Sequence, residues 1–304
     1  MFSLTALLCF ISLASAASLQ FISHPIGPNP RNVSFYIYVP ETLALQPPIL
    51  VFLHGCHGSA QDAFANSKYS SLASRYGFII IYPDSPNPAD KCWDVSSPET
   101  LTHNGGGDSQ GIVSMVQHTL GKYGADPSRV FVSGISSGAM LTNVLIGSYP
   151  DVFAAGAAFA GVPFGCFAGT GYAEWSDACA TGRITHSGQE WAAIVKRAYP
   201  SYSSYRPKMQ VYHGTADEVL NYTNFGEEIR EWTSVYGISK TPVSTCLDTP
   251  IMGWTRTVYG KGELEAYSAA NVTHDIPNQE DVVMKFFDLT CMIGGCFRRP
   301  GSTG

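Results

Sequence analysis

One eleven-residue stretch constrains the fold of this 304-residue chain more than any other. Residues 130–140 read Val-Phe-Val-Ser-Gly-Ile-Ser-Ser-Gly-Ala-Met: an apolar, strand-like run, a Gly-x-Ser-x-Gly pentapeptide and a helix-compatible run of small residues. A strand that turns sharply into a helix through this pentapeptide lifts the hydroxyl of Ser136 above the edge of a sheet. Gly134 and Gly138 provide the space that so tight a turn requires. The stretch predicts an α/β fold with Ser136 as a nucleophile.

Apolar segments on both sides of this turn predict a parallel sheet. Residues 49–53 and 78–82 are continuously apolar, as in central strands that are buried on both faces. Further strands are expected at 34–39, 129–133, 152–160, 208–212 and 264–267, and helices at 67–76, 110–123, 137–149, 189–198, 225–236 and 280–289. Asp108 or Ser109 is the expected N-cap of the helix at 110–123. The alternation predicts an α/β-hydrolase fold, with a mostly parallel central sheet and helices on both faces.

The N-terminus has the pattern of an export signal. Residues 4–13 are apolar and Ala14-Ser15-Ala16 is a small-x-small cleavage site, so residues 1–16 are predicted to be a signal peptide. That run is too short to span a bilayer, and no second run reaches about eighteen apolar residues. We therefore expect a secreted protein with no membrane association, one domain at 17–290 and a C-terminal tail at 291–304.

Composition excludes several classes of protein. Hydrophobic residues make up 45% of the chain and charged residues 14%, which is typical of a globular protein with a large core. The formal net charge is −6, and no basic patch for nucleic acid is present. The sequence also lacks paired Cys-x-x-Cys or His-x-x-x-His spacing. We expect a monomer with no nucleic-acid partner, no metal and no cofactor.

Seven cysteines remain outside the predicted signal peptide: Cys56, Cys92, Cys166, Cys179, Cys246, Cys291 and Cys296. In an oxidising compartment an odd number suggests three disulfides and one remaining thiol. Cys166 and Cys179 would close a short local loop, and Cys56 and Cys92 would join loops that follow neighbouring strands. Cys246 is expected to pair with Cys291 or Cys296 and so anchor the C-terminus.

Three N-x-S/T sequons accompany the export signal. Their acceptors are Asn32, Asn221 and Asn271, which are candidates for N-glycosylation. A glycan at Asn271 would lie close to His274, a candidate catalytic residue.

A serine hydroxyl needs a general base, and the base needs an acid that orients it. In the α/β-hydrolase arrangement these residues follow in the chain order Ser, Asp, His, each on a loop after a strand. Asp217 follows the expected strand at 208–212, and His274 follows the expected strand at 264–267. We predict Ser136, Asp217 and His274 as the catalytic triad.

Other residues fit these roles less well. His213 lies at a strand end and is expected to make a structural hydrogen bond, and His186 has no strand before it. Asp248 also lacks a preceding strand, and Asp275 is adjacent in sequence to the proposed base. A glycine–serine turn without chemistry is the alternative for the pentapeptide itself, because so short a motif also occurs by chance in a chain with 30 glycines.

Backbone N–H groups are expected to stabilise the oxyanion of the reaction. Ser137 follows the nucleophile and begins a helix, and Cys56 lies in the His-Gly-Cys segment after the strand at 49–53. We assign the oxyanion hole to these two amides, with His57 as the neighbouring alternative.

Six short stretches resemble a known family: residues 35–40 (FYIYVP), 92–94 (CWD), 101–106 (LTHNGG), 134–140 (GISSGAM), 213–217 (HGTAD) and 266–270 (AYSAA). The chain is similar to fungal secreted enzymes of carbohydrate esterase family 1, which contains type B feruloyl esterases and acetylxylan esterases and is related to polyhydroxybutyrate depolymerases. The resemblance covers about residues 19–289 and implies the same triad and the bridges Cys56–Cys92 and Cys166–Cys179. Cys246, Cys291 and Cys296 are not part of the family pattern. Some members carry a cellulose-binding module, which is not expected here.

The family resemblance implies a serine carboxylic ester hydrolase that acts on esterified plant cell-wall xylan. It favours release of ferulic acid from arabinoxylan, because residues 161–195 and 259–274 look closer to that branch. Release of acetate from xylan is the alternative, and a polyester depolymerase or an inactive carbohydrate-binding relative is less favoured.

An aromatic acyl group needs a flat apolar slot, whereas an acetyl group needs only a shallow one. Trp93, Phe167 and Trp175 are the main candidates for substrate contact, followed by Phe164, Tyr172 and Trp254. Several of them lie in the segment 161–205, which is either a rim of the pocket or a surface elaboration.

Overall fold

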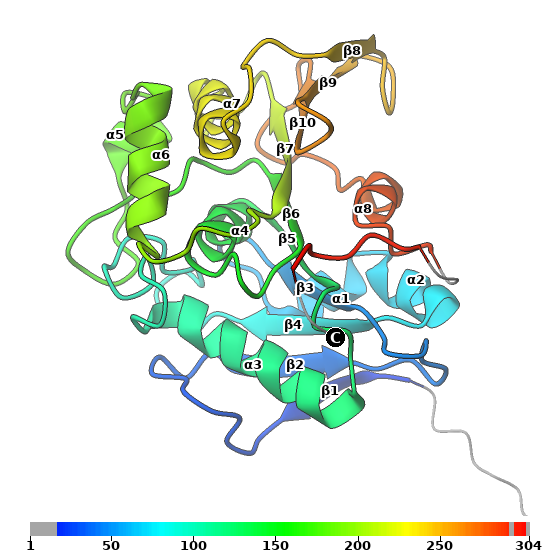
Figure 1. The fold of residues 1–304 in the computed structure, drawn as a ribbon. Coiled ribbons are helices and arrows are strands. Elements are labelled where there is room, and N and C mark those ends of the chain that lie inside the picture. Colours follow the sequence, from blue (N-terminus) through cyan, green and yellow to red (C-terminus); the bar gives the residue numbers. More distant parts are fainter. Residues whose placement is uncertain (1–16, 292–294, 302–304) are drawn as a thin grey trace, which may run out of the picture.

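A computed structural model describes residues 17–291 and 295–301. The predicted signal peptide and residues 292–294 and 302–304 therefore lie outside the described residues. Ten strands form one sheet in the order β1-β2-β4-β3-β5-β6-β7-β10-β9-β8 (Figure 1). Their bounds are β1 (Leu19–Ile22), β2 (Ser34–Tyr38), β3 (Ile49–Leu53), β4 (Ile79–Asp84), β5 (Val130–Ile135), β6 (Ala155–Phe159), β7 (Lys208–Gly214), β8 (Ser244–Leu247), β9 (Trp254–Tyr259) and β10 (Leu264–Ala269).

The six central strands are all parallel, from β4 through β3, β5, β6 and β7 to β10. Two antiparallel strands flank them on each side. The predicted mostly parallel sheet of an α/β-hydrolase is confirmed. Because the carboxyl ends of parallel strands meet at one edge of the sheet, the loops that follow β3, β5, β7 and β10 share that edge.

Helices cover both faces of the sheet (Figure 1). Their bounds are α1 (Ala60–Ala65), α2 (Tyr69–Tyr76), α3 (Gly107–Tyr123), α4 (Ser137–Ser148), α5 (Asp177–Ala180), α6 (Gly188–Arg197), α7 (Thr223–Tyr236) and α8 (Glu280–Phe286). None of these described helices combines the length and the apolar character that crossing a membrane requires.

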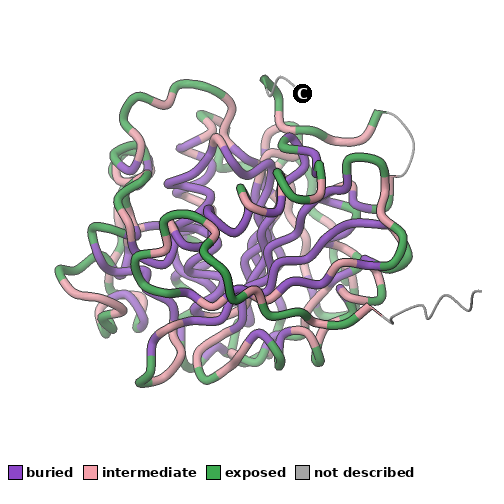
Figure 2. The backbone as a smooth tube through the Cα atoms, turned by 90° about the horizontal axis from the view of Figure 1, so that it is seen from below, coloured by how far each residue is buried: buried purple, intermediate pink, exposed green. Residues whose placement is uncertain are grey.

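The alternation of side chains along β3 explains why there are two cores. Ile49, Val51 and Leu53 pack in the core that contains residues of α3, α4, α6 and α7, whereas Leu50 and Phe52 pack in the core that contains residues of α1, α2 and α8. Successive strand residues point to opposite faces of a sheet, so a continuously apolar strand supplies both cores. Figure 2 shows these buried segments running through the middle of the molecule.

One helix ends at the glycine expected from the sequence, whereas another begins earlier than expected. α2 ends at Gly77, whose φ of 72° is left-handed, as expected from the sequence. α3, however, begins at Gly107 and not after Asp108 or Ser109. Both side chains are buried inside the first turn, where Asp108 accepts the N–H of Asp94 and Ser109 donates to the carbonyl of Thr100. Their predicted role as N-cap is wrong because these side chains bind the preceding loop.

Two parts of the sheet had no clear signal in the sequence. β1 and the hairpin β8–β9 lie at the two edges, where β1 and β8 are short and mostly exposed. Because an edge strand packs little against a core, it needs no apolar run, which was the signal used to predict the central strands.

Two of the three expected disulfides are present and one prediction is wrong. Cys56 pairs with Cys92, and Cys166 pairs with Cys179. Cys291 pairs with Cys296, five residues away, and Cys246 is a free thiol on β8. The chain after α8 lies beside the start of β5, since Arg299 donates to the carbonyl of Ser128. β5 and β8 are five strands apart, roughly 24 Å at the usual strand spacing, which is far beyond the reach of a disulfide.

Candidate active site

The three residues predicted as a triad meet at the carboxyl edge of the sheet. Ser136 follows β5, Asp217 follows β7 and His274 follows β10. The Nε2 atom of His274 lies 2.8 Å from the Oγ of Ser136, and its Nδ1 lies 2.8 Å from Oδ2 of Asp217. Both distances are those of normal hydrogen bonds. The geometry is that of a nucleophile, a base and an orienting acid.

Ser136 lies on a tight turn that packs closely against the end of β3. Its φ of 55° and ψ of −123° are unusual for a residue with a side chain. A Cβ at Gly138 would lie 2.5 Å from the carbonyl oxygen of Leu53, and one at Gly134 would lie 2.4 Å from the carbonyl oxygen of Gly138. Both glycines of the motif are therefore required by backbone packing, and the serine side chain is only partly buried.

Asp217 is held as an anion. Its Oδ1 accepts the N–H groups of Val219 and Leu220, and its Oδ2 accepts from His274 and lies 3.1 Å from Nε2 of His213. Burial alone would raise the pKa of Asp217, but the hydrogen bonds from His213 and His274 outweigh it and hold the pKa far below its usual range. A charged carboxylate orients the imidazole and stabilises its protonated form during the reaction.

His274 is fixed from a second direction. Its backbone N–H donates to the carboxylate of Glu218, 3.2 Å away. The imidazole remains 17% exposed and can reach a substrate at the surface. Glu218 was not singled out from the sequence, because nothing in its position predicts that its carboxylate turns towards a loop 56 residues later.

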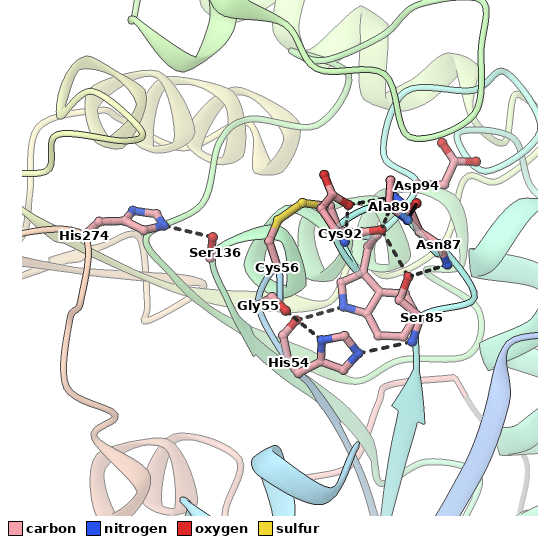
Figure 3. Close-up of a disulfide and its surroundings, with 12 residues drawn as sticks. His54, Gly55, Cys56, Ser85, Asn87, Ala89, Cys92, Asp94, Ser136 and His274 are labelled. Carbon is pink, nitrogen blue, oxygen red and sulfur yellow. Dashed lines mark hydrogen bonds between the residues drawn. A yellow bond between two sulfur atoms is a disulfide. The ribbon is translucent and has the colours of Figure 1, made fainter. Parts of the chain in front are cut away.

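The predicted oxyanion donors lie beside the nucleophile. A Cβ at Gly55 would lie 3.3 Å from the Cβ of Ser136, so the Gly55–Cys56 backbone passes directly over the serine. Figure 3 shows Ser136 with His274 on one side and the Cys56–Cys92 disulfide on the other. The N–H of His57 is already bonded to the carbonyl of Asp90 at 2.6 Å, whereas the N–H of Cys56 has no protein acceptor among the described residues. This favours Cys56 over His57 as the partner of Ser137, whose N–H begins α4 and is free of helical bonds.

His54 holds the loop that carries Cys56 in place through hydrogen bonds of both ring nitrogens. The Nδ1 of His54 donates to the carbonyl of Gly55, because its Nε2 accepts the N–H of Ser85 and so carries no proton (Figure 3). The backbone carbonyl of His54 accepts the indole N–H of Trp93 at 2.8 Å. Burial lowers the pKa of His54, which keeps the ring neutral and the bond pattern unchanged. These contacts give His54 a structural role in the loop.

Trp93 and Phe167 do not offer a surface to substrate in this structure. Trp93 is 1% exposed and bonded to His54, and Phe167 is 3% exposed. Their predicted role in substrate contact is therefore not supported, because both rings are occupied by packing. Phe164 and Trp254 are buried as well.

Two aromatic candidates remain accessible. Trp175 is 54% exposed, lies edge-on to Phe167 and donates its indole N–H to Asp177. Tyr172 is half-buried and stacks under the guanidinium of Arg31. Both lie in the segment 161–205, which is tied to the loop after β4: the carboxylate of Asp94 accepts the N–H of Ala173.

The rival residues lie elsewhere or act structurally. His213 is fully buried and bonded to the carbonyl of Leu220, as expected, and it also approaches Asp217. His186 packs against Trp191, and Asp248 accepts the N–H of Gly253 in the turn between β8 and β9. The asparagines of the three sequons, Asn32, Asn221 and Asn271, are all exposed; their glycosylation remains a prediction.

Two further features of the described residues, a hollow and a cysteine cluster, resemble sites for a ligand or a metal ion. A hollow of about 580 Å³ lies against α6 and α7, and its lining contains no member of the triad. Asp288, Cys291 and Cys296 lie close enough to share a metal ion, but the two sulfur atoms are joined in a disulfide and are not thiolates.

Comparison with known proteins identifies the family. The sequence profile of the family described as Esterase PHB depolymerase matches residues 33–238. The chain belongs to this esterase family. It is a carboxylic ester hydrolase, since its curated relatives are esterases over most of its length.

Three relatives of the esterase show how far the likeness extends. Feruloyl esterase B of Talaromyces stipitatus is 48% identical over 279 residues, which cover 90% of this chain and 77% of the relative. Acetylxylan esterase A of Emericella nidulans is 46% identical over 267 residues, 87% of each chain. The solved structure of an acetyl xylan esterase from Aspergillus awamori superposes with a TM-score of 0.87 at 43% identity, and the match covers 90% of this chain and 99% of that one.

Proposed function

We propose that this esterase is a secreted serine hydrolase that releases ferulic acid from esterified arabinoxylan. The observation that carries the serine mechanism is the pair of 2.8 Å contacts that join Ser136, His274 and Asp217. The substrate is supported by the similarity to feruloyl esterase B over 90% of the chain. Export is supported by the apolar N-terminal run and by the disulfides of the described residues.

The geometry of the site supports a two-step acyl transfer. Ser136 attacks the ester carbonyl while His274 takes its proton, and the amides of Cys56 and Ser137 hold the oxyanion of the tetrahedral intermediate. His274 then gives this proton to the leaving sugar oxygen, which departs as a hydroxyl, and a water molecule activated by the same imidazole releases the acid from its ester with Ser136. Throughout these steps Asp217 keeps the Nδ1 proton in place and balances the charge of the imidazolium.

Release of acetate from xylan is the second candidate. Two of the three aromatic side chains considered first for a ferulate slot are buried, which leaves Trp175 as the exposed one. Similarity to acetylxylan esterase A of Emericella nidulans extends over 87% of the chain. A shallow site would suit the smaller acyl group.

One set of assays tests both the mechanism and the substrate. The purified protein should hydrolyse methyl ferulate and feruloylated arabinoxylan, and Ser136→Ala should lower kcat by about 10⁴- to 10⁶-fold. Acetylated xylan and polyhydroxybutyrate films are assayed beside them under the same conditions. Full activity of Ser136→Ala would refute the serine mechanism, whereas acetate release without ferulate release would replace the proposed substrate with the second candidate.

A further inference from the structure

A second histidine, His213, contacts the acid of the proposed triad. Its ring is fully buried at the end of β7, with Nε2 lying 2.8 Å from the carbonyl oxygen of Leu220 and 3.1 Å from Oδ2 of Asp217. Both neighbours are acceptors, so Nε2 must carry a hydrogen that the carbonyl and the carboxylate share. Oδ2 of Asp217 thus faces a donor on His274 and another on His213.

Glu228 on α7 is a second, fully buried group, and it interacts electrostatically with His213. The Nδ1 of His213 and the Oε2 of Glu228 are both buried, and neither has a hydrogen-bond partner within the described ranges. Buried polar atoms without a partner are rare, and an internal water commonly bridges them. One water that donates a hydrogen to Nδ1 and shares a hydrogen bond with Oε2 would satisfy both.

Glu228 is itself anchored to the helix that begins after the nucleophile. Its Oε1 accepts from Nδ2 of Asn143 at 2.7 Å, and the carbonyl oxygen of Asn143 accepts the indole N–H of Trp232. Asn143 lies on α4, so its side chain joins α4 to Glu228 on α7. No apolar packing alone would require a carboxyl group at this depth, since burying one without full pairing is costly.

We propose that His213 is a positioning residue for Asp217, and that Glu228 holds the far side of the His213 ring through one buried water. The inference rests on the proposed role of Asp217 as the acid of the triad. Without the second donor, Oδ2 of the carboxylate would be held by His274 alone and the carboxylate would become a stronger base. The titratable groups next to this cluster are Tyr222, whose ring lies against His213, Glu231, which interacts with Glu228, and, beside His274, Glu218.

Two substitutions at one position separate the donor from the rest of the ring. The amide nitrogen of glutamine can occupy the place of Nε2, whereas that of asparagine is placed near Nδ1 and cannot reach Asp217. Each variant is titrated with a fluorophosphonate so that kcat refers only to folded, reactive sites. His213→Asn should lower kcat about 5- to 50-fold with KM within about twofold, and His213→Gln should retain several times more of the activity.

The pH profile gives a readout that general destabilisation would not move. Loss of a donor makes Asp217 more basic and strengthens its interaction with the protonated imidazole, which moves the acid limb of kcat/KM to higher pH in His213→Asn. An unchanged acid limb and kcat in that variant, or equal losses in both variants, would overturn the positioning role.

The unsubstituted enzyme offers a test that does not depend on how the variants fold. Nitrogen NMR should show His213 as the Nε2–H form, and a high-resolution crystal structure should show a water within hydrogen-bond distance of both Nδ1 and the Glu228 carboxylate. The other form of His213, or no water there, would overturn the corresponding part of the proposal. An active Ser136→Ala would instead refute the triad itself, so the two failures are distinguishable.

Discussion

Single residues at the site are held by more contacts than the reaction alone requires. Asp217 accepts two backbone N–H groups on one oxygen and faces two imidazoles with the other. His274 is bonded to two carboxylates: its Nδ1 contacts Asp217, and its backbone N–H donates to Glu218. Such preorganisation keeps the reacting atoms within the narrow distances that proton transfer needs.

The buried Glu228 should make stability depend on pH. Burial raises the pKa of Glu228 to about 7, so the folded chain retains a proton that the unfolded chain releases near pH 4.5. Stability from this group is present below that pH and is lost as the pH rises towards 7. Glu228→Gln removes this titration. Its stability relative to the unsubstituted protein should therefore increase by about 2–3 kcal/mol between pH 5 and pH 8.

Urea unfolding of both proteins at the two pH values measures this difference. The neighbouring Glu231, whose pKa is raised by burial and by the charge of Glu228, is replaced by glutamine in both proteins so that its titration does not enter the comparison. Parallel stability profiles would show that Glu228 is ionised in the folded state at neutral pH.

At the scale of elements, the site depends on how closely β5, α4 and β3 approach one another. The whole of α4 is buried between the sheet and its neighbours, and Gly138 in its first turn lies against the carbonyls of Leu53 and His54. The same contact brings β3 next to Ser136, together with the loop after it that carries Gly55 and Cys56, here called the oxyanion loop. The close packing of Gly138 against β3 therefore positions both the proposed nucleophile and the proposed oxyanion donors.

A methyl group at Gly138 should therefore disrupt the site. Its Cβ would lie 2.5 Å from the carbonyl oxygen of Leu53, which is backbone and cannot rotate away. Gly138→Ala should lower kcat/KM at least about 100-fold and stability by about 1–3 kcal/mol. Gly121→Ala on α3 is the matched control, because a Cβ there meets nothing within 4 Å; it should keep full activity and gain up to about 1 kcal/mol. Thermal unfolding and ester hydrolysis measure both, and equal behaviour of the two variants would contradict the packing argument.

At the scale of the whole molecule, the disulfides differ in what they hold. Cys56–Cys92 joins the oxyanion loop to the loop after β4 across 36 residues, whereas Cys291–Cys296 spans five residues at the end of the chain. A cross-link that closes a longer loop restricts the unfolded chain more strongly. The first bridge also fixes the residue whose N–H is proposed to bind the oxyanion.

Removing each bridge by paired Cys→Ser substitutions should separate these roles. Loss of Cys56–Cys92 should cost about 2–5 kcal/mol of stability and lower kcat, while loss of Cys291–Cys296 should have a smaller effect on stability and leave kcat unchanged. Cys246→Ser, at the free thiol on β8, controls for the substitution itself. Melting temperatures and kcat measure the effects. If kcat responded equally to both bridges, the disulfide at the oxyanion loop would have no special role.

Local sequence determined the features that depend on short-range chemistry. Continuous apolar runs predicted the central strands, because such strands supply a core on each face, and Gly-x-Ser-x-Gly predicted the sharp turn at Ser136, because only glycine fits its two flanks. The order of Ser136, Asp217 and His274 along the chain predicted which residues would meet. Trp93 was misjudged because an aromatic residue in a loop gives no local sign of whether it is buried.

Only the tertiary structure decided which distant groups lie together. Cys246 on β8 cannot reach Cys291 or Cys296, because four strands lie between β8 and β5, beside which the chain after α8 runs. The contacts of Glu218 with His274, and of His213 with Asp217 next to Glu228, arise where separate loops and helices pack at one edge of the sheet. Their geometry depends on the packing of whole elements, and no short stretch of sequence carries that information.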